Sequence, residues 1–175
     1  LDNQYTVDEA NVFFGTMDRF DWKLIGKQEL LVPYNDFGAY DTGAKVETFA
    51  GNDSIAPQSR RYELHRVWVV EANVRQGMRH QAPKRMFYID EDSWQIALVD
   101  HYDGRGQLWR VGEGHAQYHY DQKVAGYTLE ALYDVIAGRY LALGMNNEEK
   151  RGYEFGFKAS SADYTPAALR NAGVR

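Results

Sequence analysis

The sequence contains no cysteine, which excludes disulfides, thiolate metal sites and cysteine nucleophiles. It also has no excess of basic residues, because 20 Lys and Arg stand against 25 Asp and Glu and give a net charge of −5. That balance argues against non-specific nucleic-acid binding, which needs a basic face. No apolar run approaches the roughly 20 residues that would span a bilayer. The chain starts at Leu1, and its first residues lack the basic and apolar regions of a signal peptide, so we expect a soluble, processed or truncated product.

Catalytic signatures are missing as well. There is no G-x-S-x-G elbow, Walker-type loop or dinucleotide fingerprint, so we expect neither an enzyme nor a cofactor. His115 and His119 have the spacing of a helical zinc motif, but their surroundings predict a strand, which would place them about 13 Å apart. The acidic run from Asp90 to Asp92 lacks the central Gly and the final Glu of a calcium loop and favours a solvated turn. We therefore predict no metal site.

What the sequence does contain is enough apolar residues for a core, arranged for a β-sheet. The 175 residues are 44% hydrophobic, which suits one domain or part of a larger one. The dominant period is two, and it predicts a mainly β fold, an antiparallel meander with few short helices. We expect strands over residues 21–33, 61–72, 84–89, 94–102, 107–121, 127–135, 139–145 and 153–158.

The remaining segments carry weaker signals. Thr165 followed by Pro166, with Gly173 beyond, predicts a short C-terminal helix. Residues 8–14 favour a single turn of helix. Residues 41–60 are polar and have no period, so we expect a long surface loop there.

Two turns predict how the central strands pair. A turn at 90–93 would place the large apolar residues on one face, with Ile89 opposite Trp94, Phe87 opposite Ile96, and Arg85 opposite Leu98. A second turn at 103–106, with two glycines, would pair Tyr102 with Leu108 and Asp100 with Arg110. It would also set large residues against small ones, with Leu98 near Gly112, Ile96 near Gly114, and Trp94 near Ala116. Such pairs suit a curved sheet.

Aromatic residues are the most distinctive part of the composition, at 14% of the chain. They either fill a closed core or line a cavity for an apolar ligand, since such pockets carry the same side chains. The strand pattern gives these candidate ligand-binding residues: Trp68, Phe87, Ile89, Trp94, Ile96, Leu98 and Trp109.

Several stretches of the sequence resemble one family, the domain of unknown function 1329. They are DRFDWKLIGKQELLVPYN at 18–35, RYELHRVWVVEA at 61–72, KRMFYIDEDSWQIALVDHYDGRGQLWRV at 84–111, AGRYLALGMNNEE at 137–149 and YTPAALRNAG at 164–173. The resemblance covers nearly the whole chain apart from 41–60, and it matches the C-terminal part of the family's longer chain. It therefore implies that this chain is part of one larger domain.

The resemblance implies a fold similar to that of the lipoprotein carriers LolA and LolB. In these carriers a curved antiparallel sheet forms an incomplete barrel, helices plug its open side, and the cavity holds acyl chains. Family members are secreted across the inner membrane of Gram-negative bacteria, which implies a place in the periplasm or on the periplasmic face of the outer membrane. They are thought to work beside exporters of the resistance-nodulation-division type. The family brings no catalytic residues.

Three functions follow as alternatives. The first is a carrier or chaperone that buries a lipid or other amphiphile. The second is an accessory subunit of an envelope export complex, with an exporter, an outer-membrane protein or its own N-terminal portion as partner. The third is a hydrolase acting on an apolar substrate, for which the sequence supplies no nucleophile and base.

Overall fold

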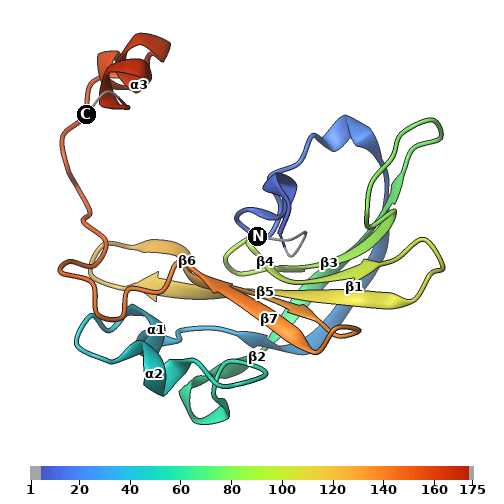
Figure 1. Cartoon of the computed structure of the whole chain (residues 1–175), viewed down its shortest axis with the longest axis horizontal. Helices are drawn as coiled ribbons and strands as arrows, with labels where there is room; N and C mark the ends of the chain where they lie inside the picture. The colour runs from blue at the N-terminus through green and yellow to red at the C-terminus, as the bar shows by residue number, and fades with distance from the viewer. Residues whose placement is uncertain (1–4, 174–175) are drawn as a thin grey trace.

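The computed structural model describes residues 5–173 and shows one sheet of seven antiparallel strands in chain order, which stays unclosed (Figure 1). Each strand pairs with the next, as in a meander. The strands are β1 (Phe20–Pro33), β2 (Tyr62–Val74), β3 (Lys84–Asp90), β4 (Ile96–Tyr102), β5 (Leu108–His119), β6 (Val124–Asp134) and β7 (Arg139–Leu143). The predicted mainly β, antiparallel fold with few short helices is confirmed.

The helices are short. They are α1 (Phe37–Tyr40), α2 (Val46–Phe49) and α3 (Pro166–Ala172), with the 3₁₀ turns η1 (Val7–Glu9), η2 (Met17–Arg19), η3 (Pro57–Ser59) and η4 (Ser161–Tyr164). The predicted C-terminal helix is confirmed as α3, where the Thr165 hydroxyl accepts the backbone N–H of Ala168 at 3.1 Å. None of the helices in the described part of the chain has the length and apolar character needed to cross a membrane.

The strand predicted over 153–158 is wrong, because that segment is irregular and pairs with no strand of the sheet. Residues 41–60 lie mostly outside regular structure, as expected, but they hold α2 and η3 and are not confined to the surface. Phe49 and Ile55 of this segment are buried against β6 and β7, where they pack with Leu129 and Ala131.

Two β-bulges change the predicted register. Ile89 pairs with Ile96, because the turn spans residues 91–95 and is longer than predicted. A β-bulge between Tyr88 and Ile89 then shifts the register by one more residue and places Val99 opposite Phe87. The predicted pairs, Ile89 with Trp94 and Phe87 with Ile96, are therefore wrong. Trp94 instead lies in the turn, with φ of 58° and 70% of its surface exposed.

The second hairpin begins as predicted and then diverges. Tyr102 pairs with Leu108, but a bulge between His101 and Tyr102 places Arg110 opposite His101 rather than opposite Asp100. The predicted pair of Asp100 and Arg110 is therefore wrong, and Asp100 accepts the Tyr88 hydroxyl at 2.8 Å instead. This one-residue shift is what brings His101 and Arg110 to the same face of the sheet.

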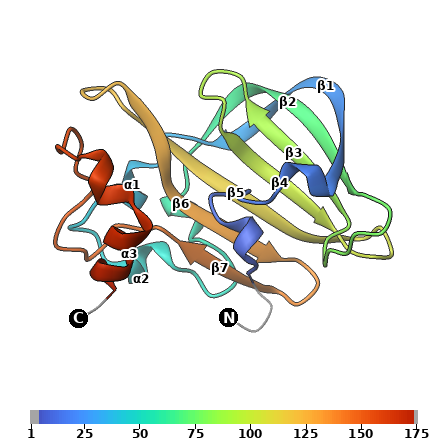
Figure 2. The ribbon, with the colours of Figure 1, turned by 90° about the horizontal axis from the view of Figure 1, so that it is seen from above.

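The sheet is covered differently on its two faces. The N-terminal segment, residues 5–19, lies on the face that is uppermost in Figure 1, and α1 and α2 lie on the opposite, lower face. Figure 2, seen from above, shows this segment lying over the middle strands. Helix α3 stands apart from the sheet at the end of an extended stretch (Figure 1).

On the lower face the end of β1 turns inward and reaches β5. Tyr34 forms a parallel bridge with Ala116, and the Asn35 N–H donates to the Ala116 carbonyl at 2.7 Å. This crossing closes a first apolar core, formed by Val32, Tyr34, Val67, Val69, Ala97 and Ala116. The sheet is thus strongly curved, and its upper face is left to the N-terminal segment.

Candidate functional site

The upper face of the sheet is organised in rows that run across the strands. Cross-strand pairing aligns a charged row at one end, which consists of Arg85, His101, Arg110 and Asp134 from β3 to β6. Two residues further along each strand, an apolar row runs from β2 to β7 through Val70, Phe87, Val99, Gly112, Leu132 and Leu141. The face therefore has an apolar floor with a cationic border.

The charged row is deeply buried. Arg85 and His101 are 0% exposed, and Arg110 is 1% exposed. Charges so far from water persist only when carboxylates or other acceptors lie beside them. Here the acceptors come from the N-terminal segment: the Arg85 Nη2 donates to Asp8 at 2.6 Å, and the Arg110 Nη1 to Glu9 at 3.3 Å.

Asp8 and Glu9 are positioned by the first turn of the chain. Both belong to η1, where Thr6 and Glu9 form a reciprocal capping arrangement. His80 also contacts Asp8, with Nε2 and the carboxylate 2.9 Å apart. Burial alone would raise the pKa of Asp8, but hydrogen bonds from His80 and Thr6 and the charge of Arg85 outweigh it and hold that pKa well below its usual range.

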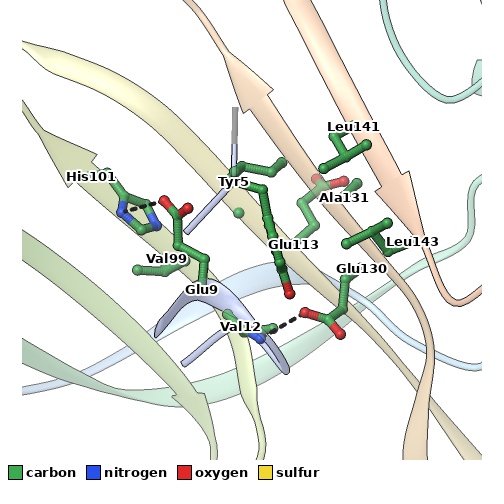
Figure 3. Close-up of a pocket in the computed structure, with 12 residues that line it drawn as sticks. Tyr5, Glu9, Val12, Val99, His101, Glu113, Glu130, Ala131, Leu141 and Leu143 are labelled. Atoms are coloured by element: carbon green, nitrogen blue, oxygen red, sulfur yellow. Dashed lines mark hydrogen bonds and ion pairs between the residues drawn. The ribbon is translucent and has the colours of Figure 1, made fainter. Parts of the chain in front are cut away.

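His101 is the neutral member of the row. Its Nδ1 lies 3.6 Å from Glu9 Oε1, and Figure 3 marks this contact with a dashed line. Burial, and after it the charges of Arg85 and Arg110, lower the pKa of His101 to about 3. The imidazole therefore stays uncharged at neutral pH and offers one N–H donor.

The apolar row is covered by the residues that follow η1. Val12 is buried on it beside Phe20, the first residue of β1, and the ring of Phe13 lies 5.3 Å from that of Phe87. The Val12 N–H donates to the Glu130 carboxylate at 2.8 Å (Figure 3). Gly112 and Gly114 permit this close cover, since a Cβ on Gly114 would lie 2.8 Å from Val12 and 2.5 Å from Tyr127.

The space left between the segment and the sheet is small. A cavity of about 20 Å³ lies there, with Tyr5, Glu9, Val12, Val99, His101, Glu130, Leu132, Leu141 and Leu143 among the residues that line it (Figure 3). This volume is close to the minimum for one water molecule. The upper face can therefore take an acyl chain only after the N-terminal segment has moved.

The structure brings together three of the seven residues predicted to bind a ligand. Phe87, Ile89 and Ile96 belong to one cluster on the upper face, beneath Val12 and Phe13. Leu98 packs in the core of the lower face. Trp68 lies under the ammonium of Lys27, 4.0 Å from its ring centroid, at the β1–β2 side of the sheet.

The other two predicted residues are Trp94, in the β3–β4 turn, and Trp109, on β5. Trp94 lies exposed in the β3–β4 turn and contributes nothing to the face. The Arg110 guanidinium lies 3.8 Å from the ring centroid of Trp109, whose Nε1 donates to Asp134 at 3.3 Å. Trp109 thus supports the charged row and does not line the apolar one.

The sequence analysis missed the charged row and its two acidic partners. A usable signal was present, because Arg85, Phe87 and Ile89 alternate along β3 and so share a face. In the same way Arg110 shares a face with Gly112.

A second polar cluster lies at the β3–β4 turn. One ligand atom from each of His65, Asp90 and Asp92 lies within 4.8 Å of the others, which is a spacing that could hold a metal ion. Two of these residues already contact each other, because His65 Nδ1 and Asp90 Oδ1 lie 2.7 Å apart, and Asp90 Oδ2 accepts the Ser93 amide N–H at 2.8 Å. The His65–Asp90 contact ties the turn to β2.

Comparison with known proteins gives the family. The profile of a family described as a protein of unknown function, DUF1329, matches residues 1–170. The chain belongs to the DUF1329 family. It is 53% identical over 174 residues to the uncharacterized protein PA3922 of Pseudomonas aeruginosa, and it covers 38% of that protein's length.

Two solved structures resemble this DUF1329 chain. One is a crystal structure named as an outer membrane lipoprotein-sorting protein domain, from Vibrio parahaemolyticus, with a TM-score of 0.51 and 12% identity over 91% of this chain and 52% of that one. The other is a DUF1329 family protein from Desulfovibrio piger, with a TM-score of 0.48 and 13% identity over 87% of this chain and 48% of that one. The first shows that this chain shares the fold of that domain. The chain spans about half the length of these structures and less of the Pseudomonas protein.

Proposed function

We propose that the protein is a carrier or chaperone for a lipid or similar amphiphile, in the periplasm or on the periplasmic face of the outer membrane. The observation that carries this proposal is the upper face, a continuous apolar row covered by a segment that belongs to no strand of the sheet. The fold is of the type named for lipoprotein sorting in the Vibrio structure, which supports the proposal by analogy.

The way the N-terminal segment is held suits a removable cover. Among the described residues, the backbone of 5–15 makes no hydrogen bond to the backbone of the sheet. Its attachments each involve a side chain: the carboxylates of Asp8 and Glu9, the ring of Phe13, and the Glu130 carboxylate, which accepts the Val12 N–H. Such a segment can leave without breaking a strand ladder.

The mechanism is burial. Each acyl CH₂ group moved from water onto the apolar row gains about 0.8 kcal/mol. The apolar contacts that the segment gives up on leaving oppose this gain, so loading and release are an exchange between two occupants of one surface. Delivery follows when the segment returns.

A second function is favoured by the exposed side of β1 and β2. β1 is an edge strand, and the facing pair Leu31 and Leu64 is 64% and 65% exposed. An apolar pair beside an open edge suits a protein partner. The accessory-subunit proposal places an exporter of the resistance-nodulation-division type, an outer-membrane protein or a further part of the longer protein there.

Native mass spectrometry after gentle extraction tests the carrier proposal. We expect adducts of lipid mass, and we expect Leu132→Asn, which places an amide in the apolar row, to weaken binding of a fatty acyl probe about tenfold. Leu64→Asn, at the exposed pair, is the matched control and should bind the probe normally. Delipidated protein that binds no acyl probe would overturn the proposal. Loss of partner co-purification in Leu64→Asn alone would favour the accessory subunit.

A further inference from the structure

The cationic border of the upper face has more hydrogen-bonding capacity than the N-terminal segment uses. Among the described residues, Arg85 Nε and Nη1 and both ring nitrogens of His101 have no hydrogen-bond partner. Both side chains are fully buried. Buried donors without acceptors are costly, and an arginine fork fits an anion with two or three oxygens better than a single carboxylate contact.

The position of the border relative to the apolar row fits an amphiphile. The two rows are two residues apart along each strand, or about 7 Å. The apolar row crosses from β2 to β7, five strand spacings or about 24 Å in all. Near its middle Gly112 carries no side chain, and a Cβ there would lie only 2.7 Å from the Val99 Cγ1. A charged head at the border therefore allows a long tail to follow the row.

The N-terminal segment itself has this pattern. Its carboxylates, from Asp8 and Glu9, meet the charged row, and the next apolar residues, Val12 and Phe13, cover the apolar row. An acidic head followed by an apolar body is what an anionic amphiphile presents. The segment is thus an occupant built into the chain.

We propose that the upper face binds an anionic amphiphile, whose carboxylate or phosphate head pairs with Arg85, His101 and Arg110 in place of Asp8 and Glu9. The tail lies along the apolar row, and residues 5–15 are displaced as it binds. This inference rests on the carrier function proposed above and adds the chemistry of the head. A neutral lipid contacts only the apolar row and forms no charge-assisted hydrogen bond with the border.

The test compares two probes, a dansyl-labelled undecanoic acid and its primary amide, on the whole chain. Asp8→Asn with Glu9→Gln removes the internal carboxylates. We expect this variant to raise the acid-to-amide affinity ratio about tenfold, the size of one charge-assisted hydrogen bond. Asp18→Asn with Glu29→Gln changes the net charge equally at exposed positions and should leave the ratio unchanged. Circular dichroism establishes that each variant is folded.

A second variant keeps the test valid if the first is unstable. Asp8→Asn with Arg85→Gln removes both partners of one buried ion pair, so neither is left unpaired, and we expect it to lose the preference for the acid. Equal affinities for acid and amide in every variant would overturn the anionic head and leave the carrier proposal standing. Failure of both probes to bind any variant would overturn both proposals.

Inorganic phosphate and acetate, titrated alone by calorimetry, separate an amphiphile from a free anion. We expect either ion to bind far more weakly than the labelled acid, because neither has a tail that can be buried on the apolar row. Phosphate binding as tight as that of the labelled acid would overturn the amphiphile and assign the border to a free anion.

Discussion

At the scale of single residues, His101 shows how the charged row depends on its surroundings. Its pKa is lowered to about 3, while an unfolded histidine titrates near 6.5. Below pH 6.5 the unfolded chain therefore binds a proton that the folded chain does not. The contribution of His101 to the free energy of unfolding therefore falls as the pH drops from about 6.5 toward 3.

His101→Gln tests this linkage. We expect the wild-type free energy of unfolding, measured with urea, to fall between pH 6.5 and 4.5 by up to about 1.4 kcal/mol per pH unit from this group. The variant should show a flatter dependence in that window, which lies above the range where most carboxylates titrate. His119→Gln, at the end of β5, is the control. An unchanged slope in His101→Gln would contradict the burial of a neutral imidazole.

The residues of the apolar and charged rows show how much of the upper face could be predicted from the sequence. Phe87 and Ile89 were correctly placed on one face, because apolar alternation along a single strand does not depend on how that strand pairs. Arg85, His101 and Arg110 were not found as a group, because their alignment depends on the bulge after His101. A bulge arises from the local backbone and leaves no mark in the hydrophobic pattern.

At the scale of elements, Gly114 links β5 to the segment above it. A Cβ there would meet Tyr127 at 2.5 Å, the Ile96 carbonyl at 2.8 Å and Val12 at 2.8 Å. We expect Gly114→Ala to lower the free energy of unfolding by about 1–3 kcal/mol through overpacking. It should also speed proteolysis within residues 5–19.

Gly126→Ala is the matched control, because Gly126 lies in the neighbouring strand β6 with nothing within 4 Å of its added Cβ. Its effect should stay within about 0.5 kcal/mol. Equal stability of both alanine variants in urea would show that the segment does not pack on Gly114.

Strand boundaries were largely predictable, and the exceptions have physical reasons. Residues 153–158 alternate like a strand, but the sheet ends at β7 and offers them no partner. There Tyr153 stacks on Tyr40 and Phe155 packs on His119, so the alternation serves ring contacts. The burial of Phe49 and Ile55 could not be predicted, because the surface they cover forms only when β6 and β7 pair.

At the scale of the whole molecule, the central feature is the division of the two faces. The lower face is closed where the end of β1 crosses onto β5. The parallel bridge between Tyr34 and Ala116 holds this crossing in place. The upper face is closed by the N-terminal segment, whose described residues 5–15 make no backbone–backbone hydrogen bond to the sheet. This asymmetry is the basis for proposing that the upper face opens, and it depends on long-range pairing that the sequence alone does not show.

The measurement that tests this account most directly is hydrogen–deuterium exchange of the whole chain with and without saturating oleate. In the free protein the amides of Val12 and Phe14 are held by hydrogen bonds to Glu130 and Asp8. With oleate we expect faster exchange across residues 9–14 and slower exchange in β3, β4 and β5. Unchanged or slower exchange across residues 9–14, with oleate bound, would contradict the displacement of the N-terminal segment.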